Sequence, residues 1–478
     1  GLVPAQVEPL LQLLAGEGSL TSGRFRAGEA AVWCDRDVLA RLKRRTLARL
    51  RDEVEPVDPE VFARFVASWQ GIPDARSKPV RRALDAVLGR LEGARITASE
   101  LGSGVLRSRG VTDENGALDQ LIASGELVWV GAGGLGPKDG RLRLLRPELV
   151  PLLHRPGPAP AEGTLEARLL RVLEERGACF LVELLQGVGA SAAPRWGAGL
   201  TLSAAFSRGP AAAAAGPTKA EVEAALWGLA WDGLVSNDSL ASLRAWCGVE
   251  GSARGRGGGG RWWSLRRSFA DGPSAADDTL KARAAALMLL ERHGVVGSSS
   301  AAAEDLPGGF AGVYPVLCEM ESLGHVRRGW FVAGLGGSWF ALPGAVEELR
   351  AHRDGGDLLH VLPTSDPGQP WGALLAWPEE LDGQWRREAG SWLVMIGGAP
   401  ALWLSRSGHA LGVRVADEAA AALADGIAAL ARRLEGAGQR ALPIRRVNGV
   451  DTAASPLLAR LRAAGMVEDG GLLLPVRR

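Results

Sequence analysis

Apolar residues recur along the chain in one short arrangement around a glycine. A leucine stands seven residues before the glycine, a leucine or methionine four before it, and a leucine or valine two after it. The glycines of the five copies are Gly18, Gly125, Gly233, Gly324 and Gly465. Apolar positions three residues apart lie on one face of a helix, and a glycine with positive φ ends that helix. Each copy therefore predicts a helix, a glycine cap and a strand on the same core.

The segments after the glycines are typical of short hairpins. Three pairs of strands stand out: GSLTSGRF with AVWC, ELVWVGAGGLG with RLRLL, and HVRRGWFV with SWFAL. In the third copy the partner strand RWWSL follows only after a Gly/Arg-rich stretch. A helix followed by such a hairpin is the recognition helix and wing of a winged-helix domain. Half of a βαβ unit would give the pattern once, but repeated copies at domain-length spacing favour tandem winged helices.

Proline- and glycine-rich stretches separate the copies, and 478 residues are too many for one ordinary domain. We predict an α+β fold class, with tandem winged-helix domains followed by a C-terminal β-rich α+β (barrel-like) domain. The predicted ranges are 1–53 (the C-terminal part of a winged helix plus a basic helix), 77–150, 164–268 with a low-complexity insert, 279–350, and 357–478 for the C-terminal domain.

Residues 36–53 are predicted to form an amphipathic helix with a basic face. Its apolar positions are Val38, Leu39, Leu42 and Leu50. Its candidate nucleic-acid-binding residues are Arg41, Lys43, Arg44, Arg45 and Arg49. The formal net charge of the chain is only +1, so binding to nucleic acid requires basic residues that are gathered locally. This face either contacts phosphates beside a wing, or is a solvated face paired with acidic neighbours.

Arginines also surround the wing of the third copy. The candidate binding residues there are Arg254, Arg256, Arg261 and Arg266. Trp262 and Trp263 in this wing either stack on a base or pack in the core. Other tryptophans fall at positions where a core is expected, namely Trp33, Trp129, Trp227, Trp231, Trp339 and Trp403.

The four cysteines share no CxxC spacing, which argues against a zinc ribbon or a disulfide scaffold and fits the reducing cytoplasm. No signal peptide and no run of about 18 apolar residues is found, so no membrane association is predicted. The phosphate-binding sequence GxxxxGK[ST] and the metal-binding sequence HExxH are absent. We therefore predict no ATPase motor, no cofactor and no metal site in this chain.

Two acids are candidates for catalysis. Asp366 lies in the proline-bounded turn TSDPGQPWG, and Asp469 lies near the end of the sequence. A carboxylate can stabilise an oxocarbenium ion or orient water when a flipped base is excised. A single acid in a turn more often forms an Asx turn, and this explanation applies to both residues.

Several long segments of the chain are distinctive, including EAALWGLAWDGLVSNDSLASLRA, LPGGFAGVYPVLCEMESLGHVRRGWFVAGLGGSWFA and TSDPGQPWGALLAWPE. Through these segments, which stand in the family's order, nearly the whole chain resembles the C-terminal region of large helicase-related (Lhr) proteins. The resemblance implies an ATP-dependent helicase of DNA repair that acts on single-stranded DNA or RNA:DNA hybrids. It places the motor, with its ATP and Mg, upstream of this chain. It also implies self-association as a homo-oligomer and similarity to AlkZ-type DNA glycosylases, whose Gln-centred catalytic motif is not found here.

Three hypotheses follow. The first is an oligomerising accessory region that binds nucleic acid beside the upstream motor domains. The second is a DNA glycosylase that excises a flipped damaged base, with Asp366 or Asp469 as the acid. The third is a structural scaffold for oligomerisation, which the near-zero net charge would suit.

Overall fold

All five glycines end helices in the computed structural model, with φ angles between 68° and 101°. In four copies the residue after the glycine donates its N–H to the carbonyl four residues before the glycine, at 2.9–3.0 Å. These acceptors are Leu14, Leu229, Met320 and Leu461. The bond is that of a Schellman cap, so the predicted helix ends are confirmed. The structure describes residues 4–25, 30–52, 55–77, 82–111, 116–189, 216–249, 259–266, 278–381, 385–416, 419–436, 442–468 and 472–474.

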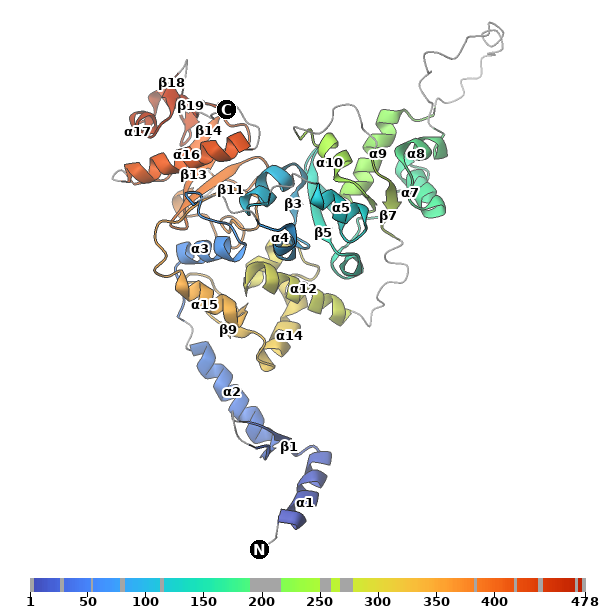
Figure 1. The fold of residues 1–478 in the computed structure, drawn as a ribbon, viewed down its shortest axis with the longest axis vertical. Helices are drawn as coiled ribbons and strands as arrows, with labels where there is room; N and C mark the ends of the chain where they lie inside the picture. The colour runs from blue at the N-terminus through green and yellow to red at the C-terminus, as the bar shows by residue number, and fades with distance from the viewer. Residues whose placement is uncertain are drawn as a thin grey trace.

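The middle of the chain contains three units, of which the second and the fourth share one order of helices and strands and the third has the helix α10 between its two strands (Figure 1). The second unit comprises α4 (Leu84–Leu91), β3 (Ile96–Thr97), the π-helix η2 (Leu101–Leu106), α5 (Ala117–Ala123), β4 (Val128–Gly134) and β5 (Gly140–Leu145). The third comprises α7 (Leu165–Arg176), α8 (Leu181–Gly187), α9 (Lys219–Trp231), β6 (Val235–Asn237), α10 (Leu240–Trp246) and β7 (Trp262–Ser264). The fourth comprises α12 (Asp278–His293), β8 (Val295–Val296), α13 (Ser298–Ala303), α14 (Gly309–Ser322), β9 (Arg327–Gly329) and β10 (Trp339–Ala341).

The C-terminal part contains two sheets. The larger runs in the order β11-β12-β13-β14-β16-β17, and α16 (Ala420–Gly436) packs on it. Its strands are β11 (Leu359–Pro363), β12 (Trp392–Ile396), β13 (Ala399–Leu404), β14 (Ala410–Val413), β16 (Arg446–Val447) and β17 (Val450–Asp451). Within the described residues no pairing joins β11 to β17, so this sheet is open, unlike the barrel-like arrangement that we predicted. The α+β fold class is confirmed.

The second sheet has the order β15-β19-β18, in which the first strand pairs with the third and the third with the second. The same order occurs in the second unit (β3-β5-β4) and in the fourth (β8-β10-β9). The elements around it are β15 (Leu442–Ile444), α17 (Leu458–Ala463), β18 (Val467–Glu468) and β19 (Leu472–Leu474). The copy of the helix, glycine and strand pattern at Gly465 therefore belongs to a unit that has the strand order of a winged helix.

Hydrophobic cores cross from one unit to the next. One core contains residues of both the second and the third unit, and the Trp129 indole donates to the Asn237 carbonyl at 2.8 Å. A side chain at Gly131 in β4 would place its Cβ 1.8 Å from the Ala230 carbonyl oxygen of α9, so only glycine allows this approach. A second core joins α3 (Pro59–Trp69), the fourth unit and the larger sheet. The domain ranges predicted from the sequence stay a prediction.

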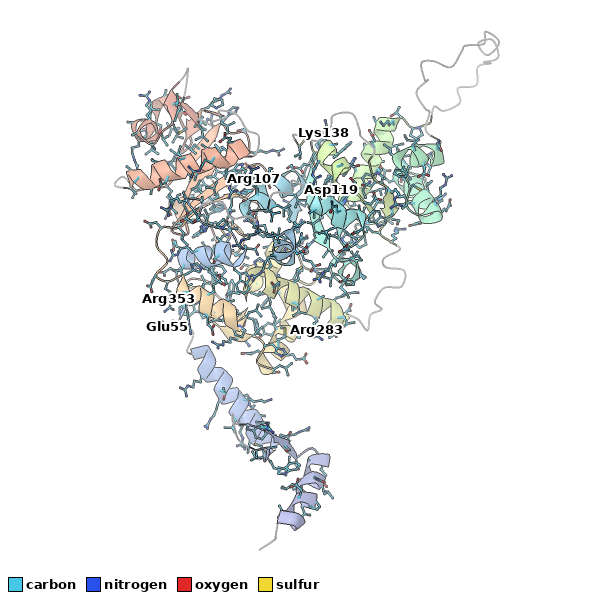
Figure 2. All side chains as sticks on the ribbon, in the orientation of Figure 1. Glu55, Arg107, Asp119, Lys138, Arg283 and Arg353 are labelled. Carbon is cyan, nitrogen blue, oxygen red and sulfur yellow. The ribbon has the colours of Figure 1, made fainter. Side chains whose placement is uncertain are left out.

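An N-terminal arm, residues 4–52, extends from this body (Figure 1). It consists of α1 (Pro4–Gly16), the hairpin β1 (Leu20–Gly23) and β2 (Val32–Asp35), and α2 (Arg36–Asp52). The chain enters the body where Val57 pairs with Val332 and Arg353 bonds to Glu55 at 2.7 Å (Figure 2). None of the helices within the described ranges is both long and apolar enough to cross a membrane.

Candidate nucleic-acid interface

The basic helix predicted from the sequence is α2. Asp35 begins it, because its carboxylate accepts the N–H groups of Asp37 and Val38 at 2.9 Å. The predicted binding residues Arg41, Lys43, Arg44, Arg45 and Arg49 are all exposed. The first four form no ion pair with any residue that the structure describes. α2 carries seven basic and two acidic residues in a chain of net charge +1, so it concentrates positive charge.

The apolar face of α2 is not covered by the body of the protein. Val38 is 39% exposed and Leu42 is 52% exposed, whereas Leu39 is half-buried. The side chain of Leu50 lies outside the described ones. The amphipathic pattern correctly predicted a helix, but the arm extends from the body, so little of the chain packs on this face. α2 lies beside β9 of the fourth unit.

Two of the candidate arginines around the third wing are held in ion pairs. The Nε of Arg261 lies 2.8 Å from Asp238, and Arg266 lies 3.4 Å from Glu174. Their charge is therefore partly compensated within the chain. Arg254 and Arg256 lie outside the described residues. Arg41, Lys43, Arg44 and Arg45 of α2 are thus the candidate residues whose charge no described acid compensates.

Most of the tryptophans expected in the core are there. The buried ones are Trp129, Trp227, Trp231, Trp339 and Trp403, whereas Trp33 is half-buried. Trp262 is 3% exposed and meets Trp227 edge-to-face at 5.0 Å between ring centroids. Stacking on a base is thus open to Trp263, which is half-buried, and not to Trp262.

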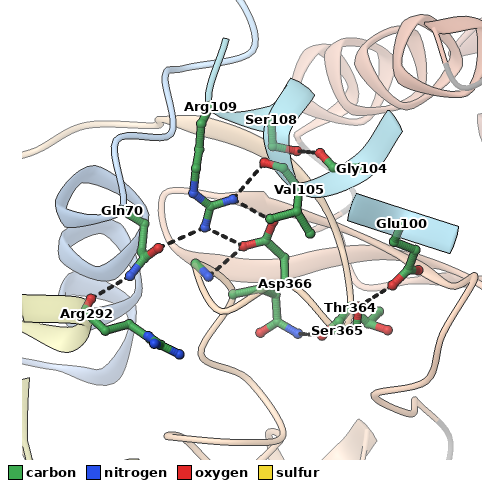
Figure 3. A network of polar contacts seen from close by, with 12 residues as sticks. Gln70, Glu100, Gly104, Val105, Ser108, Arg109, Arg292, Thr364, Ser365 and Asp366 are labelled. Carbon is green, nitrogen blue, oxygen red and sulfur yellow. Dashed lines mark hydrogen bonds and ion pairs between the residues drawn. The ribbon is translucent and has the colours of Figure 1, made fainter. Parts of the chain in front are cut away.

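Asp366 lies in a closed polar network at the centre of the body (Figure 3). Its side chain is 0% exposed, and its two oxygens accept from both terminal nitrogens of Arg109 at 2.8 and 2.9 Å. Its Oδ1 also accepts the Gly368 N–H at 2.7 Å, which is an Asx turn. The turn-forming explanation for Asp366 is therefore confirmed. In this conformation no atom of its carboxylate can reach a substrate, and Asp469 lies outside the described residues.

The network around Asp366 links four parts of the chain. Arg109, which follows η2, also donates to the side chain of Gln70 at 2.9 Å, and Gln70 donates to the carbonyl of Arg292 in α12 at 2.5 Å. Arg387 donates to the Asp366 carbonyl at 3.0 Å, and burial lowers the pKa of Arg387 to about 10. Buried polar groups with these partners are costly to separate, so the network fixes how the units sit against each other.

A second buried acid faces the same turn. The carboxylate of Glu100 accepts from the Ser365 hydroxyl and from the Gly390 N–H, the latter at 2.7 Å. Burial raises the pKa of Glu100, and its hydrogen bonds to Ser365 and Gly390 oppose that rise. These bonds tie the second unit to the C-terminal part.

A cavity of about 410 Å³ opens between the second and third units, where η2 faces α10. Its polar lining comprises Ser99, Ser103, Arg107, Asp119 and Arg244. Asp119 accepts from Arg244 at 2.6 Å, and its carboxylate is 28% exposed. Figure 2 labels Arg107 and Asp119, which both lie in the second unit. The searched part of the chain contains no group of His, Cys, Asp and Glu side chains that could hold a metal ion.

Comparison with known proteins decides the family. Two sequence models described as "Large helicase-related protein, winged-helix domain" match the chain. The model of the family's third such domain matches residues 57–147, which contain the second unit described above, and the model of the fourth matches residues 275–359, which contain the fourth unit. The "Lhr helicase/ probable uracil glycosylase" of Mycolicibacterium smegmatis is 32% identical over 486 residues, which cover 94% of this chain. The chain belongs to the large helicase-related family. It corresponds to the C-terminal region of these proteins.

A further member of the large helicase-related family is the "Lhr helicase/uracil glycosylase" of Escherichia coli, 27% identical over 504 residues and 96% of this chain. The chain spans about 30% of the length of the two curated relatives. Among solved structures, the Streptomyces sahachiroi DNA glycosylase AlkZ aligns with a TM-score of 0.48 and 16% identity, covering 82% of this chain and 100% of that one.

Sequence reasoning missed the residues that close the network and the cavity. Arg109 and Asp366 are 257 positions apart, and no local pattern indicates that they pair. Asp119 sits on the polar side of a predicted helix, where a solvated acid is the ordinary expectation. The one available signal was the glycine-rich run LGSG at residues 101–104, which is unusual within a helix and which forms η2.

Proposed function

We propose that this chain is an accessory region that binds nucleic acid through the arginine face of α2, beside the motor of the parent helicase. The observation that carries the proposal is the exposed basic face of α2, on which Arg41, Arg44 and Arg45 form no ion pair with a described residue. Arg41, Arg44, Arg45 and Arg49 fall within one side of the helix at 100° per residue. Arg41 and Arg49 are separated by about 12 Å along the axis, which spans roughly three phosphates of a duplex strand.

Replacing Arg41, Arg45 and Arg49 together by alanine is expected to weaken binding to an oligonucleotide by roughly 1000-fold or more at low salt. Each charge-assisted hydrogen bond to a phosphate contributes about 1.5 kcal/mol or more. The slope of log affinity against log salt should fall by about 2 to 3, because fewer counterions are released. Fluorescence anisotropy with labelled single-stranded and duplex DNA, repeated over a salt series, measures both quantities.

The matched control is the double variant Arg261→Ala and Arg266→Ala, which removes two arginines that are also exposed but ion-paired. It is expected to change affinity less than about threefold. Equal losses in the two variants would contradict an interface on α2. If neither the variants nor the original chain bind the oligonucleotide, the scaffold hypothesis is the one that remains.

Self-association is part of the same proposal. The arm exposes several large apolar side chains, namely Leu10, Leu13, Leu14, Val38 and Leu42. An exposed apolar face of this kind supports a contact with another copy or with upstream domains. Light scattering on the arginine variant separates the two activities, because a loss of DNA binding with unchanged mass assigns binding and assembly to different faces of the arm.

The second candidate function is uracil excision, which the names of both relatives favour. The cavity lined by Arg107 and Asp119 has the volume of a small-ligand site, at about 410 Å³. Asp119 is a partly exposed carboxylate that lines this cavity, and a carboxylate can stabilise positive charge on a sugar or orient water. Asp366 would need the buried network to open before it could act.

Incubation with single-stranded DNA that carries one uracil, followed by alkali, tests excision. The expected result is strand scission that Asp119→Asn abolishes while the melting temperature stays unchanged. Asp366→Asn and Asp469→Asn are tested in parallel. Scission that is lost in the Asp366 or Asp469 variant but not in the Asp119 variant would place the active site at that other acid. If the original chain causes no scission, this candidate function is wrong.

A further inference from the structure

Trp330 differs from the other described tryptophans. It is 55% exposed, whereas the others are buried or half-buried. Its chain neighbours Phe331 and Val332 are 1% and 0% exposed. The backbone is thus anchored in the core immediately after a side chain that stays outside.

The Trp330 ring is also held in place. Its Nε1–H donates to the Leu335 carbonyl at 3.0 Å, so the polar edge of the indole is already satisfied within the wing. Two residues later Val332 pairs with Val57, at the point where the arm enters the body. An aromatic face that is exposed and fixed loses little conformational freedom when a flat ligand stacks on it.

The ring lies beside the basic helix. Trp330 directly follows β9, and β9 lies beside α2. Arg327 in β9 is half-buried and makes no ion pair within the described ranges, which adds a cation at this junction. A basic surface next to an exposed aromatic ring can bind single strands, because phosphates meet the cations and an unpaired base stacks on the ring.

We propose that Trp330 stacks on a base of a single strand whose phosphates lie along α2. This inference rests on the proposed function and adds the residue that would make the interface prefer a single strand to a duplex. In a duplex each base is already stacked between its neighbours, so a ring beside the backbone has no free face to meet. The wing of the fourth unit would then provide the preference for single strands and α2 would provide general affinity.

Trp330→Ala is the direct test, in the full chain, by anisotropy with oligo(dT) and with a duplex of the same length. The expected loss of affinity is about 5-fold to 150-fold for the single strand and less than about twofold for the duplex. Trp330→Phe should retain most of the affinity, because the aromatic face remains. Leu323→Ala is the control, since Leu323 is 62% exposed in the same unit but has no aromatic face.

An equal loss on both nucleic acids, or no loss on the single strand at an unchanged melting temperature, would overturn the inference. The failure of stacking is distinguishable from the failure of the proposed function. If the α2 arginine variant loses binding and Trp330→Ala does not, only stacking is wrong. If the unaltered chain binds neither oligonucleotide, the interface on α2 is wrong as well.

Discussion

Replacing Arg109 by methionine is expected to lower the free energy of unfolding by about 3–5 kcal/mol. The substitution removes the guanidinium that neutralises Asp366, and both side chains are 0% exposed. A buried carboxylate without a partner is strongly unfavourable, and the bond from Arg109 to Gln70 is lost as well. Urea unfolding followed by tryptophan fluorescence measures the change.

Two companion variants make this result specific. Arg353→Met breaks the exposed pair with Glu55 and is expected to leave stability unchanged. The double variant Arg109→Met and Asp366→Leu should recover much of the loss, because it removes the unpaired charge together with its partner. An Arg109→Met variant as stable as Arg353→Met would show that the network does not hold the units together.

Acid is expected to destabilise the fourth unit through Glu304. Burial raises the pKa of this carboxyl, but the guanidinium of Arg292 at 2.7 Å, with His293 and Arg143, outweighs burial and holds the pKa at about 2. The ordinary value is 4.5, so the group contributes stability above about pH 4.5 that is lost as the pH falls toward 2. The contribution is about 3 kcal/mol, from 1.36 kcal/mol per pKa unit.

Urea midpoints of the original chain and of Glu304→Gln, measured from pH 7 to pH 3, test this expectation. The variant should be less stable at pH 7, and the gap between the two proteins should narrow below about pH 4.5. A constant gap across the whole range would show that Glu304 is not held ionised by Arg292. Burial lowers the pKa of His293, so this neighbour is expected to stay neutral at pH 7 and to contribute no charge of its own there.

Predictions from the sequence succeeded where the cause was local. The apolar spacing around Gly233 or Gly465 depends on residues within about ten positions, and the helix end forms by the same bonds in each copy. The prediction of the basic helix was correct for the same reason. The ion pairs of Arg261 and Asp366 could not be predicted, because Asp238 and Arg109 lie 23 and 257 positions away and no local pattern brings them together.

The exposure of Trp330 also could not be predicted from the sequence. Trp330 and Trp339 both flank strands of one wing, and by hydrophobicity alone both are core residues. Only the packed structure distinguishes them, because Trp339 is 2% exposed and Trp330 is 55% exposed. Burial is a property of how elements meet, and the chain pattern does not encode which side of a short strand faces a neighbouring unit.

The sequence by itself determined the repeated helix, glycine and strand units, the basic helix and the resemblance to large helicase-related proteins, since each follows from short-range pattern or from similarity. The tertiary structure alone decided which charges are compensated. It buries Asp366 against Arg109 and pairs Arg261 with Asp238, whereas Arg41, Arg44, Arg45 and Arg49 of α2 remain exposed. The physical reason is that ion pairing and desolvation depend on distances between segments far apart in the chain.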